Sequence, residues 1–571
     1  MTRSLLLLSF LACLAQPFAA ASREARPAPD ARASSAQAPA ADVARQVESL
    51  LARSYPADAP GVAVLVARGD TVLYRGAHGR ADVAAGTPLK PEDRFRIGSV
   101  TKQFAAAGVL KLVEAGKVKL DDPLSKYVPG YPNGDAITVL QLLNHTSGVK
   151  SYTGISGHMA GPIRNDLSTT QLIDVFKDHP VDFAPGAEWS YNNSGYVLAG
   201  AVIEAASGMP WHEYLRIAFF EPLGMRDTGD GHDPAVVAKQ VAGHTHDGSK
   251  PVPAMPLSMT QPHAAGALVS NVDDLLRWNR ALHEGRVLES ESYRRMITPE
   301  GAAAGPGANY GFGLVADTVR NRPQLQHGGG IFGFSTQLSY LPGPDITVVV
   351  LENADTFPGR ERPSAVARRL AAIALGDPYP ASTPIAADAA ALKAMEGVYR
   401  FDATTTRTLR VVDGRLTAQR SGSVRSTLVP IAADDFLYED GFNRLTLQRD
   451  AQGRITGMRF FANGEGEGVV GARTAEPLPV EAQGIALPRE ALERLVGNYT
   501  ASDMLMKTFV DGTSLKAQLV GQPAFTLQAS SPVRFAVPEV GAEVEFAGGD
   551  GPAVSLTLRQ GGQVIEFKRM P

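Results

Sequence analysis

The chain has 571 residues, which is too long for one ordinary domain and predicts about two to four domains. With 44% hydrophobic and 20% charged residues, it has the composition of a folded soluble protein. The net charge of -4 argues against a nucleic-acid partner, which would favour a basic surface.

The chain begins with a predicted secretory signal peptide, residues 1–21. A basic end is followed by a short apolar run and by the small residues Ala19 to Ala21. The run is too short to span a membrane, and Cys13, the only cysteine, lies within it. Cleavage would leave a cysteine-free protein in an oxidising compartment, so we expect a secreted or periplasmic location. The alternative is a lipid anchor at Cys13, although Phe10 stands where such signals usually carry leucine.

Residues 22–41 are rich in Ala, Pro, Arg and Ser and are predicted to form a disordered leader. Residues 42–377 then alternate between strand and helix patterns. The expected elements are a helix at 42–52, a hairpin at 61–74, helices at 195–206 and 211–220, strands at 337–341 and 346–351, and a helix at 362–375. Strands at both ends with helices between them predict an α+β domain, in which helices and a helical lobe flank an antiparallel sheet.

The remaining third of the chain contains an internal repeat. Residues 378–389 read as a linker, and the pattern of residues 392–399 recurs at 492–499. Short strand-like runs separated by turns follow each copy, so two small all-β antiparallel barrels are predicted at 390–475 and 486–571. We expect these barrels to pack and shape the cleft rather than to bind a ligand of their own.

Three short motifs carry the chemistry: Ser99-Val-Thr-Lys102, Tyr191-Asn-Asn193 and His327-Gly-Gly329. A serine hydroxyl is a weak nucleophile that needs a nearby base, and a lysine at i+3 shares its helix face. Ser-x-x-Lys by itself also describes a solvated pair on a helix surface. Here, apolar residues at helical spacing follow directly, so Ser99 is predicted to begin a largely buried helix.

We expect neither a metal nor a cofactor. The most metal-like segment, His244-Thr-His246-Asp247, lacks zinc-type spacing and reads as a loop. Residues 328–333 match a dinucleotide-binding glycine pattern, but a strand pattern follows where that motif requires a helix.

With these motifs in hand, the chain resembles the serine hydrolases of the class C β-lactamase, DD-peptidase and D-aminopeptidase group, over roughly residues 45 to 375. Further matching segments are Leu142 to Gly148, Pro222 to Met225, Gly266 to Ser270 and Tyr310 to Gly313. The resemblance implies a β-lactamase/DD-peptidase-like fold with an active site between its lobes.

The resemblance also implies roles for residues in and beside the motifs. The candidates are catalytic Ser99, Lys102, Tyr191, Asn193 and His327, oxyanion-hole donors at Ser99 and Gly330, and substrate-binding Asn193, Gly328 and Gly329. Lys102 is the first candidate base; Tyr191 is the second, and also the candidate proton donor. The two groups form a coupled system, so the sequence leaves the assignment open.

The third motif separates this chain from some relatives. Class C β-lactamases have lysine-threonine-glycine there, whereas this chain has His327 and Gly328 in the first two places. Losing a cation and a hydroxyl weakens the case for a substrate carboxylate, and histidine-x-glycine occurs in D-aminopeptidases, D-amino acid amidases and some DD-peptidases.

The sequence therefore predicts a secreted serine hydrolase that cleaves amide bonds through an acyl-enzyme, most like a D-aminopeptidase acting on short D-residue peptides or amides. The alternatives are a β-lactamase-like esterase, a weak penicillin-binding DD-peptidase, or a catalytically silent binding protein. The expected partner is a small peptide, amide or ester, with no nucleic acid and no membrane span. The sequence does not determine the oligomeric state.

Overall fold

The computed structural model describes residues 39–570, except residues 156, 248–249, 306, 356, 358–359, 380–383, 404, 422, 424, 440, 480–484, 502–503, 520–523, 539, 550 and 561–562. The predicted signal peptide, Cys13 and nearly all of the predicted leader lie outside the described residues.

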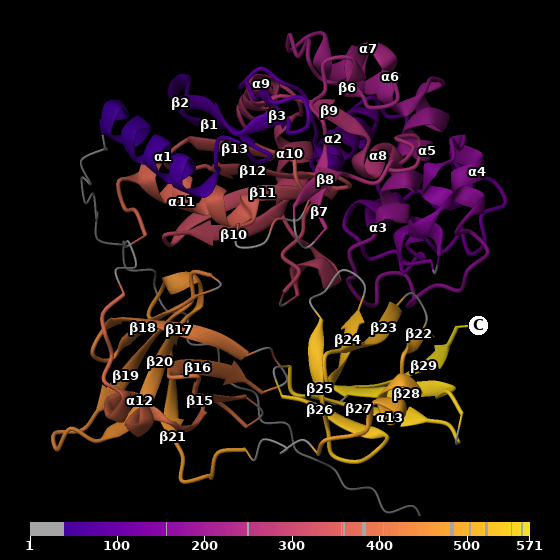
Figure 1. Cartoon of the computed structure of the whole chain (residues 1–571). Coiled ribbons are helices and arrows are strands. Elements are labelled where there is room, and N and C mark those ends of the chain that lie inside the picture. The colour runs from indigo at the N-terminus through magenta and orange to yellow at the C-terminus, as the bar shows by residue number, and fades with distance from the viewer. Residues whose placement is uncertain are drawn as a thin grey trace, which may run out of the picture. The chain divides into compact units, whose positions relative to one another are not determined.

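An antiparallel six-stranded sheet forms the centre of the first region (Figure 1). In spatial order its strands are β10 Val315–Val319, β11 Arg322–Ile331, β12 Phe334–Leu341, β13 Ile346–Glu352, β1 Val62–Arg68 and β2 Thr71–His78. Strands β1 and β13 pair in register from Val62 opposite Glu352 to Arg68 opposite Ile346. Segments almost 300 residues apart in sequence are thus neighbours in one sheet.

Both faces of the sheet are covered, which explains why β1 is a continuous apolar run. Side chains alternate between faces along a strand. Val62, Val64 and Val66 pack in one core with α1 (Ala40–Ser54) and α11 (Pro363–Leu375). Ala63, Leu65 and Ala67 belong to a second core on the opposite face.

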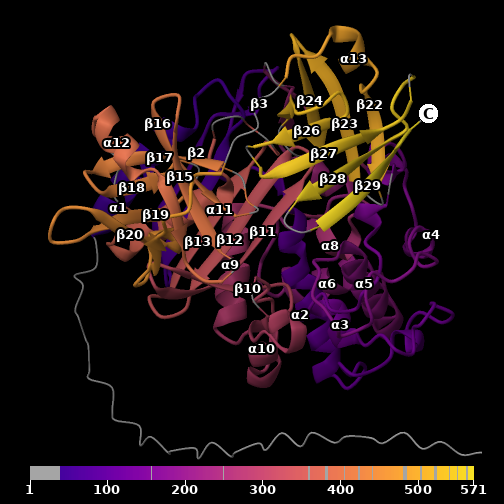
Figure 2. The ribbon, with the colours of Figure 1, turned by 90° about the horizontal axis from the view of Figure 1, so that it is seen from below.

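The second core contains most of the helices of this region. They are α2 Thr101–Glu114, α3 Val139–Leu143, α4 Thr169–Asp174, α5 Asn193–Ser207, α6 Trp211–Leu215, α8 His263–Gly266, α9 Val272–His283 and α10 Ser290–Ile297. The short helix α7 (Pro234–Val237) contributes no buried residue. Helices α2, α5 and α8 pack against one another (Figure 2). The helix predicted at 211–220 continues from α6 as a π-helical turn, Arg216–Phe220.

Three small sheets complete this region. They pair β3 Arg80–Asp82 with β4 Thr87–Pro88, β9 Leu268–Ser270 with both β5 Phe95–Arg96 and β6 Gly229–Asp230, and β7 His244–His246 with β8 Pro251–Pro253. The loop predicted at 244–247 was therefore wrong, because pairing with β8 makes most of it a strand. The His244 side chain is buried, with Nδ1 3.2 Å from the Asn353 carbonyl oxygen.

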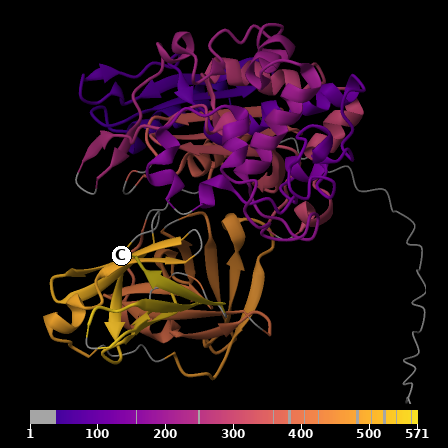
Figure 3. The same cartoon turned by 90° about the vertical axis from the view of Figure 1, so that its right-hand side faces the viewer.

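Two closed eight-stranded antiparallel barrels follow (Figure 3). The first comprises β14 Gly397–Arg400, β15 Thr406–Val412, β16 Arg415–Arg420, β17 Arg425–Ala432, β18 Asp435–Tyr438, β19 Arg444–Arg449, β20 Ile455–Phe461 and β21 Val469–Arg473. The second comprises β22 Gly497–Ala501, β23 Met504–Asp511, β24 Ser514–Leu519, β25 Phe525–Ala529, β26 Arg534–Val537, β27 Ala542–Ala547, β28 Ser555–Gln560 and β29 Gln563–Arg569.

The sequence repeat forms the same local structure in each barrel. A short helix, α12 (Ala389–Met395) or α13 (Arg489–Glu493), precedes the first strand. The hydroxyl of Tyr399 donates to the Met395 carbonyl at 2.7 Å, and that of Tyr499 donates to the Leu495 carbonyl at 3.0 Å. The predicted fold class, an α+β domain followed by two small β-barrels, is confirmed.

None of the helices in the described residues combines the length and apolar character needed to cross a lipid bilayer.

Candidate active site

Ser99 lies in a 3-10 turn, Gly98–Val100, that leads directly into α2. Gly98 has a φ of +51°, and a Cβ at this position would lie 3.0 Å from the Gly330 nitrogen. A Cβ on Gly329 would lie 2.0 Å from the Ile97 carbonyl oxygen. The turn and β11 therefore touch backbone to backbone, which only glycine permits, and this contact brings Ser99 beside Gly330.

Lys102 lies one helical turn after Ser99 and is completely buried. Its Nζ lies 3.1 Å from Ser99 Oγ, 2.9 Å from Asn193 Oδ1 and 2.9 Å from the Ala265 carbonyl oxygen. The structure therefore does not contain the solvated surface pair that Ser-x-x-Lys can also describe. The first two motifs meet at a single nitrogen atom.

Burial determines the charge state that Lys102 favours. Removing the ammonium from water lowers the pKa of Lys102 well below its usual value. A neutral amine has two N–H groups and one lone pair. The Asn193 amide oxygen and the Ala265 carbonyl can only accept hydrogen bonds, so they take the two N–H groups and leave the lone pair for the Ser99 hydroxyl.

Tyr191 stands just before α5, where the Asn192 side chain caps the helix by accepting from the Gly195 N–H at 2.8 Å. Lys102 Nζ lies 4.7 Å from the centre of the Tyr191 ring. Although 38% of Tyr191 is exposed, burial of its phenol raises its pKa, and the contact with Ser99 acts in the opposite direction. Tyr191 thus favours a protonated phenol, whereas Lys102 favours a neutral amine.

His327 lies on β11 near Tyr191, with the ring centres 6.1 Å apart, but its ring nitrogens contact other groups. Nδ1 lies 2.6 Å from the Gly328 carbonyl oxygen, so Nδ1 carries the proton and donates it. Nε2 then accepts from the Tyr310 hydroxyl at 2.8 Å. Burial lowers the pKa of His327 to about 3, so the ring is neutral.

Two residues that sequence analysis did not single out complete this cluster. The His145 ring lies 4.4 Å from the Tyr191 ring and 4.5 Å from the Tyr310 ring, between centres. His145 Nδ1 accepts from the Asn192 N–H at 3.2 Å, which fixes the segment that carries Tyr191. His145 and Tyr310 belong to the segments Leu142 to Gly148 and Tyr310 to Gly313, which match the related serine hydrolases. That match is the sequence signal by which they could have been found.

A pocket of about 320 Å³ opens beside Ser99. Its lining includes Asn193 and Gly330, while Gly328 and Gly329, the other predicted substrate-binding residues, are absent from the described lining. The remaining lining side chains are mostly apolar: Tyr152, Met159, Ile163, Leu257, Pro262, Ile331 and Phe332. Such a pocket suits a small organic group better than a hydrated ion.

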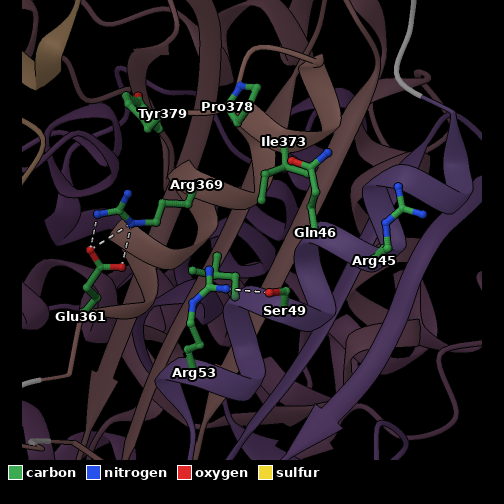
Figure 4. Close-up of a pocket in the computed structure, with 10 residues that line it drawn as sticks. Arg45, Gln46, Ser49, Arg53, Glu361, Arg369, Ile373, Pro378 and Tyr379 are labelled. Atoms are coloured by element: carbon green, nitrogen blue, oxygen red, sulfur yellow. Dashed lines mark hydrogen bonds and ion pairs between the residues drawn. The ribbon is translucent and has the colours of Figure 1, made fainter. Parts of the chain in front are cut away.

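A second hollow, of about 810 Å³, lies on the other face of the sheet, between α1 and α11 (Figure 4). Three arginines line it, and each has a partner: Arg45 contacts Asp42, Arg53 contacts Ser49 and Arg369 pairs with Glu361. None of the three motifs contributes to its described lining. The serine site is therefore the place where the motifs, a pocket and shifted pKa values coincide.

Comparison with known sequences agrees with this geometry. The family model described as Beta-lactamase matches residues 46–373, more than half of the chain. Penicillin-binding protein 4* of Bacillus subtilis (strain 168) is 27% identical over 398 residues, covering 65% of this chain and 86% of that protein. A D-aminopeptidase of Gluconobacter oxydans (strain 621H) is 27% identical over 336 residues, covering 56% of this chain and 60% of that protein.

Solved structures give the same result. The octameric penicillin-binding protein homologue from Pyrococcus abyssi aligns with a TM-score of 0.54 and 26% identity, covering 73% of this chain and 96% of that one. A D-amino acid amidase from Ochrobactrum anthropi SV3 aligns with a TM-score of 0.51 and 25% identity, covering 59% and 98%. The resemblance drawn from the sequence motifs is confirmed, and the chain belongs to the Beta-lactamase family of serine hydrolases.

Proposed function

We propose that this chain is a secreted serine hydrolase that cleaves amide bonds through an acyl-enzyme on Ser99. The observation that carries the proposal is the 3.1 Å contact between Lys102 Nζ and Ser99 Oγ, at an amine whose N–H groups have two other acceptors. A buried neutral amine with its lone pair directed at a serine hydroxyl is an activated nucleophile.

The steps follow from this arrangement. Ser99 Oγ bonds to the carbonyl carbon while its proton passes to Lys102 Nζ. The oxyanion accepts hydrogen bonds from the N–H groups of Ser99 and Gly330, two residues that line the same pocket where the turn meets β11. The C–N bond then breaks as the Tyr191 phenol donates a proton to the leaving nitrogen and regains one from Lys102. Water, deprotonated by the same pair, releases the acid and frees Ser99.

We further propose D-aminopeptidase-like specificity for short D-residue peptides or amides. His327 and Gly328 occupy the places of a lysine and a threonine, and the buried, neutral His327 offers no charge to a substrate carboxylate. No lysine or arginine occurs among the described residues that line the pocket. The D-aminopeptidase and the D-amino acid amidase among the relatives support the same choice.

An esterase is the second candidate. Esterase EstB of Burkholderia gladioli is 30% identical over 361 residues and is matched over 89% of its length. An ester has a better leaving group than an amide, so the same Ser99 and Lys102 would serve it without help from Tyr191.

The test compares paired D- and L-alanine p-nitroanilides, p-nitrophenyl butyrate and nitrocefin, using the wild-type protein and Ser99→Ala. We expect cleavage of the D-anilide, at least about a thousandfold slower in Ser99→Ala because the nucleophile is missing. Ester cleavage without anilide cleavage would select the esterase, and nitrocefin turnover would restore a β-lactamase. Activity retained in Ser99→Ala would remove Ser99 as nucleophile, while failure of a fluorophosphonate to label the wild type would favour a silent binding protein.

A further inference from the structure

The pocket beside Ser99 lies on one side of the candidate machinery. Its lining includes Asn193 and Gly330, whereas Tyr191 and His327 are not among the lining residues. In the proposed reaction Tyr191 donates a proton to the leaving group. The pocket on the Asn193 side therefore receives the acyl part of the substrate. The groups that line the pocket therefore select the acyl part.

The described lining contains one acidic residue, Asp355, and no lysine, arginine or histidine. Asp355 follows β13 by three residues and is half-buried. The Gly333 N–H donates to Asp355 Oδ2 at 2.8 Å and is one of the groups that contact this carboxylate. Gly333 belongs to the turn after β11. Its hydrogen bond therefore ties the carboxylate to the end of the strand that also carries Gly330.

A carboxylate among apolar walls acts more strongly on a neighbouring charge than one in open water, because the surrounding dielectric is lower. It attracts a cation and repels an anion. Lys102, although close, is buried behind Ser99, and it is not part of the described lining. Asp355 is therefore the one acidic or basic side chain of the described lining that a substrate in the pocket would meet.

We propose that Asp355 is the specificity-determining residue that pairs with a positively charged group on the acyl part of the substrate. The proposal rests on the hydrolase function above and narrows its substrate class to cationic acyl donors, of which an amino acid amide with a free ammonium group is one. Asp355 takes no part in bond making. It affects substrate binding by contacting the acyl part of the substrate rather than the leaving group.

Two p-nitrophenyl esters test this without depending on amide cleavage. One carries 4-(trimethylammonio)butyrate and the other its carbon isostere 5,5-dimethylhexanoate, so the pair differs in charge but hardly in shape. Each is assayed with the wild-type protein, Asp355→Asn and Asp166→Asn. Asparagine can still accept from the Gly333 N–H, so the first variant keeps the turn. Asp166 accepts from the Ser258 hydroxyl at 2.6 Å, beside the lining residue Leu257, and gives a matched loss of charge outside the pocket.

We expect the wild type to prefer the cationic ester by about tenfold or more in kcat/KM, as for a partly buried ion pair. Asp355→Asn should lose that preference, mainly through KM, and leave the neutral ester within about twofold. Asp166→Asn should behave like the wild type. An equal fall for both esters in Asp355→Asn, or no preference in the wild type, overturns the proposal. Failure to cleave D-anilides would count against the proposed amidase alone, because both ester comparisons would still be readable.

Discussion

At the residue scale, the central question is which group accepts the proton of Ser99. The sequence left Lys102 and Tyr191 as alternatives. In the structure, burial lowers the pKa of Lys102 and raises that of Tyr191, so at neutral pH the amine is the better base and the phenol the better acid. Tyr191 could act as the base only as an ionised phenol, a tyrosinate. A neutral Lys102 has no positive charge with which to stabilise that ion.

The pH profile follows from those directions. A base acts only when it is deprotonated, so kcat/KM should rise with pH as Lys102 loses its proton, with a midpoint well below the usual lysine value of about 10.4. The fall expected from Tyr191 ionisation should lie above the usual tyrosine value of about 10. Hydrolysis of the D-anilide, the reaction that uses Tyr191, is therefore measured from pH 5 to 10. The rate should rise within this range and should not fall, and a falling limb near neutrality would contradict the assignment of Tyr191 as the acid.

Lys102→Arg is the matched test of the same point, because arginine keeps the charge but does not deprotonate in this range. We expect a loss of at least about a thousandfold in kcat. Lys111→Arg is its control, since Lys111 lies on the same helix α2 and pairs with Glu114 at the surface. Comparable activity in both variants would show that Lys102 acts only as a positive charge.

At the scale of elements, the site depends on how closely the Ser99 turn approaches β11. Successive glycines on β11 point to opposite sides, so Gly329 faces the turn while Gly330 faces the pocket. The Thr336 hydroxyl on β12 donates to the Ile97 carbonyl at 2.9 Å and fastens the turn to the sheet. Glycine at 98 and 329 thus permits the close approach that brings Ser99 and Gly330 to one pocket.

Gly329→Ala and Gly330→Ala therefore should differ sharply. A Cβ at 329 would lie 2.0 Å from the Ile97 oxygen and 2.3 Å from Thr336 Oγ1, whereas a Cβ at 330 meets nothing within 4 Å. We expect Gly329→Ala to lower the free energy of unfolding by about 1–3 kcal/mol and to reduce kcat strongly, as in an overpacked contact. Gly330→Ala should keep wild-type stability in urea unfolding, and equal stability of the two variants would refute the close approach.

At the scale of the whole molecule, the chain contains separate hydrophobic cores. The two cores of the first region draw on residues 43–374, and the two barrels have cores within 392–458 and 492–567. Every described residue that lines the serine pocket lies between Gly98 and Asp355. We therefore propose that bond making depends on the first region and that the barrels act on solubility and on access by longer substrates.

Deleting residues 386–571 tests this proposal. The cores of the first region remain whole, so we expect a folded fragment with Ser99-dependent cleavage of p-nitrophenyl butyrate within about threefold of the full chain. Under this proposal the ratio of peptide to small-ester cleavage should change, because the barrels restrict which substrates enter. A well-folded fragment with an unchanged substrate profile would argue against a role in shaping the cleft.

Much of this could be predicted from the sequence, because it rests on local patterns. Apolar runs on either side of Gly69-Asp70 identified the hairpin of β1 and β2, and helical patterns identified α5 and α11. The repeat of Tyr399 at Tyr499 revealed the two barrels, and the Ser99-to-Lys102 spacing located the buried pair. These features are encoded within a few residues of one another, so no long-range contact was needed to find them.

The tertiary structure alone decided what depends on distant segments meeting. The strand at His244–His246 exists because β8 pairs with it. The Tyr310 hydroxyl, rather than that of Tyr191, donates to His327 Nε2, a contact between residues 17 positions apart that only the folded chain brings together. Asp355 reaches the pocket through the pairing of β13, β12 and β11, which no local pattern contains. The sequence thus determined the chemical groups and the family. Packing determined their charge states and their partners, since desolvation and approach are properties of the assembled fold.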